Sequence, residues 1–389
     1  MIPFNFKLFF KLAYLSLFKT KGTHGRLTGK RVVFLVIATL TYIPLQLIHG
    51  FFLLLDWVFF PAFNKIEVKQ PVFIIGNPRT GSTHLMRVLA KDEKNFAVAK
   101  LWELVLAPSI TQRKLVRALG KLDQRLGSPL KNWILEWEAR AFREGRKYRR
   151  VRFELPDEDE LSLLTIFSAI HLVFAFPFLE AFRPIVFFDQ KVSPTDQRHF
   201  MAYYKRCMQR TLYIYGTEKH ILSKSPANSG RVGTLGESFP DGRFIYLTRT
   251  PLEVFPSLMS LFSFNASLFA DLLEPYPFGD KLLEMTKHWY SYPLDTLEQN
   301  VNGYLVLRYE DLVQDLDGSV HEIYTSLGLE IHPAYTQSLQ TAVAKAEDYN
   351  SRHDYSLAAM GYTPEQIIAE YRDAFERFGF ETAVKKTIR

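Results

Sequence analysis

The chain has 389 residues, 47% of them hydrophobic and 15% aromatic, so it is long and apolar enough to bury a full core. Its single cysteine, Cys207, excludes a disulfide framework within the chain and favours a reducing compartment. The net charge of +7 suits anionic partners such as a nucleotide or a lipid headgroup. No basic run interleaves with aromatic residues in a recognisable motif, so we expect no nucleic-acid partner.

The first 60 residues favour contact with a membrane. Residues 4–18 are aromatic and aliphatic, with Lys7 and Lys11 on one helical face, which is typical of an interfacial helix. The stretch Val32–Leu55 contains no Asp, Glu, Lys or Arg and is long enough to cross a bilayer. Pro44 interrupts its middle, so two shorter helices that dip into one leaflet fit equally well. A third reading is a layer packed against the rest of the protein.

The two shorter helices would be Val32–Ile43 and Leu45–Phe60. A secretory signal peptide is not indicated, because the apolar part is too long and lies too far along the chain. The composition changes near residues 61–70. We therefore expect a membrane-associating helical segment over residues 1–65 and a second domain over residues 66–389.

A phosphate-binding pattern opens the second domain. Val72–Ile75 is apolar and predicts a buried parallel strand, and a helical pattern begins at Ser82. Between them Gly76 and Gly81 have the spacing of a Walker A loop, but the position of its lysine is occupied by Ser82, and the basic residue is Arg79. Backbone N–H groups and the helix dipole at such a turn favour an anion.

A mainly helical region of about residues 104–210 follows. Leu155–Glu160 contains four consecutive acids and indicates the start of a helix. Ser162–Phe178 is then nearly all apolar and predicts either the wall of an apolar pocket or a core helix. Asn265-Ala-Ser267 is a sequon for N-glycosylation.

A second strand running into a helix begins at Arg243. Arg249 would stand at the C-terminal end of this strand, the edge at which open α/β sheets bind ligands. Ser257 lies about two helical turns further on and could face the same place. An arginine and a hydroxyl at one spot suit a phosphate monoester. Another strand is predicted over Tyr304–Arg308.

Together these segments resemble the sulfotransferases that use 3′-phosphoadenosine 5′-phosphosulfate (PAPS), in their large, mostly microbial branch. The 76–83 loop resembles the 5′-phosphosulfate loop of the family, and Arg249 with Ser257 resembles its 3′-phosphate pair. The resemblance covers residues 71–380. Further matching stretches are Leu101–Leu104, Leu222–Pro226, Tyr309–Leu312, Asp354–Leu357 and Gly361–Thr363. Asn228 departs from the pattern, where a histidine is more usual, and the C-terminal glycine-rich PAPS motif of the cytosolic animal enzymes is not visible.

The resemblance implies an α/β fold in which a P-loop-NTPase-like parallel sheet is flanked by helices, with the helical insertion at about 104–210 lining the acceptor pocket. Arg79 would contact the bridging oxygen, and Lys224 would contact the nucleotide or the sulfuryl group. Arg352 and Tyr355 would close over the nucleotide. The residues that would hold the 5′-phosphosulfate are Thr80, Gly81, Ser82 and Thr83. We expect no metal, because no His or Cys ligand spacing is present.

The acceptor hydroxyl needs a base within hydrogen-bond reach. Glu103 is the first candidate, because several carbohydrate sulfotransferases place a glutamate at a similar interval after the first helix. A structural ion pair is the alternative role for Glu103. His171 and Glu158 are the next candidates for the base.

The abundant aromatics and the apolar N-terminus predict a small apolar alcohol or a lipid as acceptor, and a membrane surface contacted through residues 1–60. We expect a monotopic anchor with the catalytic domain facing the cytoplasm, where PAPS is made; a Golgi lumen is the alternative. A membrane-linked glycan is the alternative acceptor, and a non-catalytic nucleotide-binding protein the alternative function. A P-loop kinase is disfavoured by the missing Walker lysine. The oligomeric state stays open.

Overall fold

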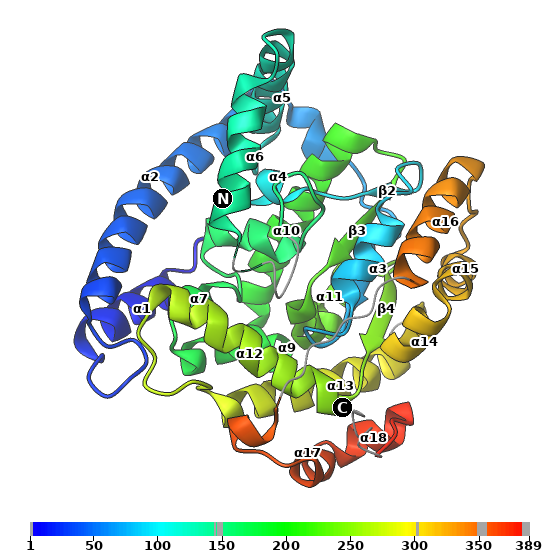
Figure 1. The fold of residues 1–389 in the computed structure, drawn as a ribbon. Helices are drawn as coiled ribbons and strands as arrows, with labels where there is room; N and C mark the ends of the chain where they lie inside the picture. The colour runs from blue at the N-terminus through cyan, green and yellow to red at the C-terminus, as the bar shows by residue number, and fades with distance from the viewer. Residues whose placement is uncertain (1–2, 144, 146–150, 301–302, 348–355, 383–389) are drawn as a thin grey trace.

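The computed structural model describes residues 3–143, 145, 151–300, 303–347 and 356–382. Its centre is a five-stranded parallel sheet in the order β2-β3-β1-β4-β5, which confirms the predicted α/β fold (Figure 1). The strands are β1 Val72–Ile75, β2 Phe96–Ala97, β3 His220–Lys224, β4 Arg243–Thr248 and β5 Tyr304–Arg308. Strand β1 pairs with β3 on one side and β4 on the other, so the chain changes direction across the sheet beside β1. Ligands of open α/β sheets bind at such a switch point.

Helices cover both faces of the sheet because β1 is apolar on both sides. Phe73 and Ile75 belong to one buried cluster, which includes residues of α10, α12 and α13. Val72 and Ile74 belong to a second cluster, which includes residues of α3, α15 and α16. All four side chains of β1 are buried. Two cores therefore clamp this strand and fix the position of the loop that follows it.

The helices divide into an N-terminal pair, the elements around the sheet, and the insertion between β2 and β3. The N-terminal pair and insertion helices are α1 Phe6–Phe18, α2 Gly29–Phe59, α4 Leu101–Val105, α5 Ile110–Arg125, α6 Pro129–Ala141, α7 Leu172–Ala175, α8 Arg183–Val186, α9 Phe188–Lys191 and α10 Pro194–Tyr215. The others are α3 Ser82–Leu89, α11 Val232–Ser238, α12 Pro251–Phe269, α13 Gly279–Asn300, α14 Tyr309–Gln314, α15 Leu316–Leu327, α16 Pro333–Glu347, α17 Pro364–Glu370 and α18 Arg372–Phe378. Short 3₁₀ helices are η1 Pro61–Lys65, η3 Asp159–Ile166, η4 Leu179–Phe182, η5 Pro226–Arg231 and η6 Ala358–Met360.

The apolar stretch 162–178 is not one core helix. It begins in η3, turns at Phe167, which has a positive φ of 56°, and continues through the single-turn helix α7. Pro177 lies beyond the end of α7 and cannot donate a helical hydrogen bond. Most of the apolar side chains are nevertheless buried in the larger core, and some line the cavity described below.

Helix α2 is one continuous helix of 31 residues that passes through Pro44, so the alternative of two shorter helices is wrong. At 1.5 Å per residue it is about 46 Å long. Three polar side chains of α2, Arg31, His49 and Asp56, are buried against the protein. Asp56 forms an ion pair with Arg210 at 2.8 Å, and His49 contacts Gln112. Most of the side chains that α2 exposes are apolar, among them Leu40, Leu47 and Leu54.

Candidate active site

The loop after β1 has the backbone of an anion cradle. Gly76 has a φ of 129°, and a Cβ there would lie 2.1 Å from the carbonyl oxygen of Leu247. Gly81 has a φ of 85° and precedes the first turn of α3, where a Cβ would strike the ring of Tyr309. Both positions therefore require glycine. The loop delivers its N–H groups to the start of α3 at the C-terminal end of β1, which suits a phosphate or sulfate group.

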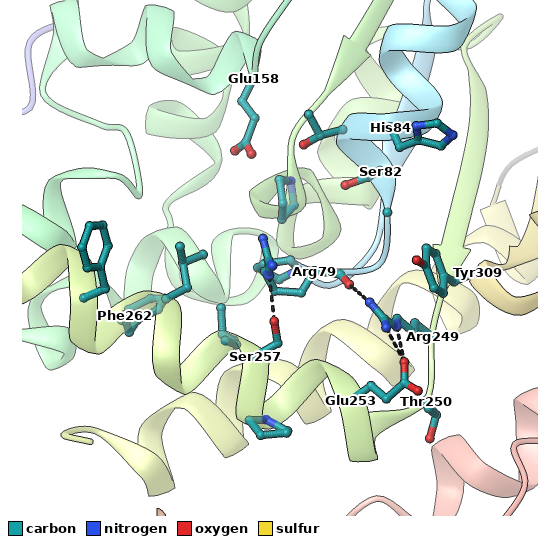
Figure 2. Close-up of a pocket in the computed structure, with 18 of the residues that line it drawn as sticks. Arg79, Ser82, His84, Glu158, Arg249, Thr250, Glu253, Ser257, Phe262 and Tyr309 are labelled. Carbon is teal, nitrogen blue, oxygen red and sulfur yellow. Dashed lines mark hydrogen bonds and ion pairs between the residues drawn. The ribbon is translucent and has the colours of Figure 1, made fainter. Parts of the chain in front are cut away.

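Arg79 is the centre of this loop. It holds a φ of 73°, a left-handed conformation that is uncommon for a residue with a side chain and that concentrates at functional sites. Its Nε donates to the Oγ of Ser257 at 2.9 Å, and its carbonyl oxygen accepts from Nη1 of Arg249 at 3.1 Å (Figure 2). Arg79 thus links two predicted site residues that do not bond to each other.

The other loop residues divide by where their side chains lie. Thr80 is fully buried, and its Oγ1 donates to the carbonyl oxygen of Asn77 at 2.9 Å, so this side chain shapes the loop and only its backbone is left for a ligand. Gly81, Ser82 and Thr83 line the large cavity. The contacts of these three residues with a 5′-phosphosulfate stay predictions. Ser82 and Thr83 could contribute side-chain hydroxyls, and Gly81 only its backbone.

Arg249 lies where the sequence predicts it, at the end of β4. Its guanidinium pairs with Glu253 one helical turn further on and stacks over the ring of Tyr309, 4.1 Å from the centroid. The spacing of four residues between Arg249 and Glu253 was readable from the sequence. The contact with Tyr309 was not, because it joins β4 to the start of α14. A 3′-phosphate binding Arg249 would compete with the carboxylate of Glu253.

A lysine and two further groups meet at the end of β3. The Nζ of Lys224 donates to one carboxylate oxygen of Glu158 at 2.6 Å, and Nε2 of His171 lies 3.3 Å from the other oxygen. All three residues line the same cavity as Arg79. Figure 2 shows Glu158, Arg79 and Ser82 around one space. The structure therefore brings the second and third candidates for the base next to the predicted lysine.

Glu103 lies elsewhere. Its side chain is 0% exposed, one oxygen accepts from Arg117 at 3.0 Å, and the other accepts from the Tyr215 hydroxyl at 2.8 Å and from the backbone N–H of Lys100. Burial, and then the charge of Glu103, raise the pKa of Tyr215, which keeps this hydroxyl a neutral donor. Glu103 does not line the cavity that contains Arg79. Its burial and its contacts favour the alternative of a structural ion pair over the predicted role as the base.

Of the four acids in the run 157–160, only Glu158 lines the cavity. Glu160 forms a buried ion pair with Arg231 at 2.8 Å. Asp159 accepts from the hydroxyl of Tyr204 at 2.5 Å, and burial raises the pKa of Asp159 to about 6. Glu158, directly before Asp159, lines the cavity beside Lys224. Asn228, the departure from the family pattern, is buried and donates toward Ser223 and Tyr204.

Arg79, Glu158, His171, Lys224 and Arg249 line one cavity of about 2280 Å³ at the C-terminal ends of β1, β3 and β4. It extends from the loop along α12, and its far part is lined by apolar side chains of α7 and α12. No group of His, Cys, Asp and Glu suited to a metal ion occurs among the described residues. Arg352 and Tyr355, predicted to close over a nucleotide, lie outside the described residues.

The chain is similar to known proteins over most of its length. Residues 71–333 match the sequence model of the sulfotransferase family. Two curated relatives, both named omega-hydroxy-beta-dihydromenaquinone-9 sulfotransferase Stf3, from Mycobacterium bovis and Mycobacterium tuberculosis, are each 26% identical over 338 residues, covering 82% of this chain and 77% of theirs.

Two crystal structures share the fold. Sulfotransferase STF9 from Mycobacterium avium superposes with a TM-score of 0.71 at 18% identity and covers 98% of both chains. STF1 from Mycobacterium tuberculosis has a TM-score of 0.66 at 17% identity, covering 94% of this chain and 92% of its own. Both cover more of the chain than residues 71–333, so the shared fold extends beyond the matched family segment.

Proposed function

Because the chain belongs to the sulfotransferase family, we propose that it transfers a sulfuryl group from PAPS to the hydroxyl of a hydrophobic, lipid-like acceptor. The observation that carries this proposal is the meeting of an anion-binding loop, Arg79, and the Lys224–Glu158 pair in one cavity with an apolar extension. This combination supplies a place for the donor, a proton acceptor and a pocket for an apolar alcohol.

The donor side fits a 5′-phosphosulfate and a 3′-phosphate. The glycine-bounded loop presents N–H groups and Arg79, which stabilise negative charge that grows on a leaving phosphate. Arg249 lies at the neighbouring strand end and contacts the same loop through the carbonyl oxygen of Arg79, which suits a second anion of the same nucleotide. Charge on both anions is thus met by guanidinium groups, which form strong charge-assisted hydrogen bonds with oxyanions.

The reaction resembles phosphoryl transfer in requiring an in-line arrangement and little covalent chemistry from the protein. Glu158 takes the proton of the acceptor hydroxyl as its oxygen bonds to sulfur, while the bond from sulfur to the phosphate oxygen breaks. The products are the sulfate ester and adenosine 3′,5′-bisphosphate, and the proton passes from Glu158 to solvent. Lys224, held against Glu158, stabilises the transferring sulfuryl oxygens. Glu158 belongs to the predicted pair of alternatives, and it replaces Glu103 as our proposed base.

An apolar acceptor is supported by two features. The part of the cavity beyond Glu158 is lined by side chains such as Val173, Phe174 and Phe262, and pockets of this kind bind apolar ligands with a few polar contacts. The curated relatives are named for a menaquinone-derived lipid that carries a hydroxyl. We propose an acceptor of the same broad class for this chain, an alcohol on an aliphatic or isoprenoid chain.

Membrane attachment is supported by α2. Two described helices are long and apolar enough to cross a membrane, but only 6% of the most apolar part of α2 is buried, against 44% for α12. Helix α2 is bonded to the body near both ends, through Arg31 to Ala175 and through Asp56 to Arg210. A helix held along the body in this way suits a monotopic anchor that lies in one leaflet. We propose that the enzyme faces the cytoplasm, so protease added from that side of sealed vesicles should digest the catalytic domain.

The test is an assay of the purified full chain with PAPS and a panel of sterols, fatty alcohols, phenols and soluble sugars. We expect the mass of a sulfuryl group to be added to apolar alcohols. Sulfation of a soluble sugar with none of the apolar alcohols would support the glycan alternative. Retention of the chain on immobilised adenosine 3′,5′-bisphosphate without turnover of any acceptor would support a non-catalytic protein.

A further inference from the structure

The cavity has a polar end and an apolar arm. The polar end contains the loop, Lys224 and Glu158. Beyond it, the apolar side chains that line this arm are Ile170, Val173, Phe174, Leu261, Phe262 and Leu268, and the polar side chain of Asn265 lines the cavity beside them. In Figure 2, Phe262 lies on the opposite side of Arg79 from Arg249. The arm therefore leads away from the nucleotide side of the site.

Helix α12 gives the arm its direction. Ser257, Leu261, Phe264 and Leu268 recur every three or four residues and all line the cavity, so one face of the helix borders it continuously. From Ser257 to Leu268 this face is about 16 Å long at 1.5 Å per residue. Phe174 of α7 also lines the cavity and packs against Phe262, with ring centroids 5.0 Å apart. The arm is long enough for an extended chain of about ten carbons.

The far end of the arm lies beside the start of α2. Leu268 lines the cavity and is 46% exposed, so the cavity reaches the surface at this residue. Next to it, the Nζ of Lys30 donates to the carbonyl oxygen of Ser267, and Nη1 of Arg31 donates to that of Phe269 at 3.3 Å. In Figure 1, α12 runs from the sheet toward α1 and α2.

The surface at this end of α2 is apolar. Val32, Val33 and Val36 are exposed in the two turns that follow Lys30 and Arg31. Phe34, between them, packs on Phe269 with ring centroids 4.9 Å apart. The end of the arm and the exposed face of the proposed membrane helix are thus joined by direct contacts.

We propose that the acceptor enters laterally from the membrane, through the opening at Leu268, and that its chain lies in the arm along α12 while its hydroxyl reaches Glu158. This inference rests on the proposed function and adds the route of entry and the site of the chain. The physical reason is the free-energy cost of exposing an apolar chain to water, which grows with each CH₂ group. An opening beside α2 lets a chain of about ten carbons pass between two apolar surroundings and avoids this cost.

The first test compares two primary alcohols that differ in how they reach the site. Full-length enzyme in phosphatidylcholine–phosphatidylglycerol vesicles is assayed with hexadecan-1-ol in the bilayer and with hexan-1-ol in solution. Leu268→Asp places a carboxylate at the opening, and we expect the ratio of the two kcat/KM values, hexadecan-1-ol over hexan-1-ol, to fall about tenfold or more because a chain cannot pass a charged group without loss.

Leu273→Asp is the matched control. Leu273 is 47% exposed and follows α12 without lining the cavity. Its substitution by Asp introduces the same charge as Leu268→Asp. We expect the ratio to stay within about twofold of wild type, as for ordinary surface substitutions. An equal fall of the ratio in both variants, or a fall in neither, overturns the proposal.

A second readout does not require turnover. A hexadecan-1-ol that carries a diazirine near its chain terminus is cross-linked in the same vesicles with adenosine 3′,5′-bisphosphate present. We expect labelled peptides from residues 258–269 and the start of α2. Labelling there, together with no sulfation of the same alcohol in a parallel assay with PAPS, would keep the entry route and refute the proposed reaction. Labelling confined to other surfaces overturns the route itself.

Discussion

At the residue scale, the choice between Glu103 and Glu158 turns on burial. Both are glutamates near a strand end, and both have a basic partner. Glu103 is locked among Arg117, Tyr215 and a backbone N–H at 0% exposure. Glu158 keeps a 12% exposed side chain at the cavity wall. A base must reach the proton that it removes, so accessibility decides between two residues that sequence spacing alone ranked the other way.

Glu158→Gln should lower kcat by about 10²–10⁴-fold, because an amide cannot take the acceptor proton. Affinity for adenosine 3′,5′-bisphosphate, measured by calorimetry, should stay near wild type. Glu103→Gln is the matched control and should instead lower the melting temperature, since a buried partner of Arg117 is weakened at a cost of about 1–3 kcal/mol. Near-normal turnover of Glu158→Gln would move the base to His171.

Arg249→Ala should weaken binding of adenosine 3′,5′-bisphosphate by about tenfold or more, the usual effect of losing a charge-assisted hydrogen bond of 1.5–3 kcal/mol. Adenosine 5′-phosphate lacks the 3′-phosphate and should be affected little. Ser257 holds Nε of Arg79, so Ser257→Ala should weaken both nucleotides. Equal losses for both nucleotides in Arg249→Ala would contradict its assignment to the 3′-phosphate.

At the element scale, α2 has two faces with different tasks. Its buried polar groups reach across to the body, as in the Asp56–Arg210 pair, which is 0% and 3% exposed at its two side chains. Its outer face exposes leucines at intervals of seven residues, Leu40, Leu47 and Leu54. Deleting the whole segment would remove both faces at once. Substitutions on a single face separate attachment to the membrane from stability of the fold.

The triple variant Leu40→Gln, Leu47→Gln, Leu54→Gln should release the enzyme from vesicles and leave its melting temperature unchanged. Each leucine contributes about 1.5–3 kcal/mol when fully buried in an apolar phase. Asp56→Asn should do the reverse: vesicle binding persists, and stability falls by about 3–5 kcal/mol because the buried Arg210 loses its charged partner. Co-sedimentation and thermal unfolding distinguish the two. Unchanged sedimentation of the triple variant would refute membrane contact through this face.

At the scale of the whole molecule, positive charge concentrates where the apolar helices lie. Residues 1–60 contain seven Lys or Arg residues and one acid, a net +6 of the total +7. All of these cations except Arg31 are exposed: Lys7, Lys11, Lys19, Lys21, Arg26 and Lys30. The arm of the cavity ends beside Lys30. The proposed membrane contact and the proposed route of the acceptor therefore lie on one side of the protein.

Binding of the full chain to vesicles should depend on both lipid charge and salt. Each cation near an anionic surface is worth about 1 kcal/mol, and salt screens this attraction over a Debye length of about 10 Å at 0.1 M. We expect affinity for phosphatidylglycerol vesicles to fall by about tenfold or more between low and high salt, while weaker binding to phosphatidylcholine changes little. Salt-independent binding to both would show that these cations do not face the lipid.

The sequence by itself determined the strand, loop and helix of the proposed anion site, because local spacing dictates them. The apolar run 72–75, the glycines at 76 and 81 and the placement of Arg249 at a strand end were all readable in this way, and the parallel sheet followed. The continuous course of α2 through Pro44 was not readable, because a proline inside a helix is tolerated or not according to the contacts around it.

Only the tertiary structure decided which carboxylate faces the cavity. The cluster of Glu158, His171 and Lys224 forms where the insertion packs on β3. Because its members come from separate parts of the chain, no sequence spacing predicts it. The path of the apolar arm to the start of α2 likewise depends on long-range contacts. Lys30 contacts Ser267, and Arg31 contacts Phe269, across sequence separations of 237 and 238 positions. Local pattern indicates which groups can bind an anion, whereas long-range packing decides which side chains line the cavity and where its apolar arm ends.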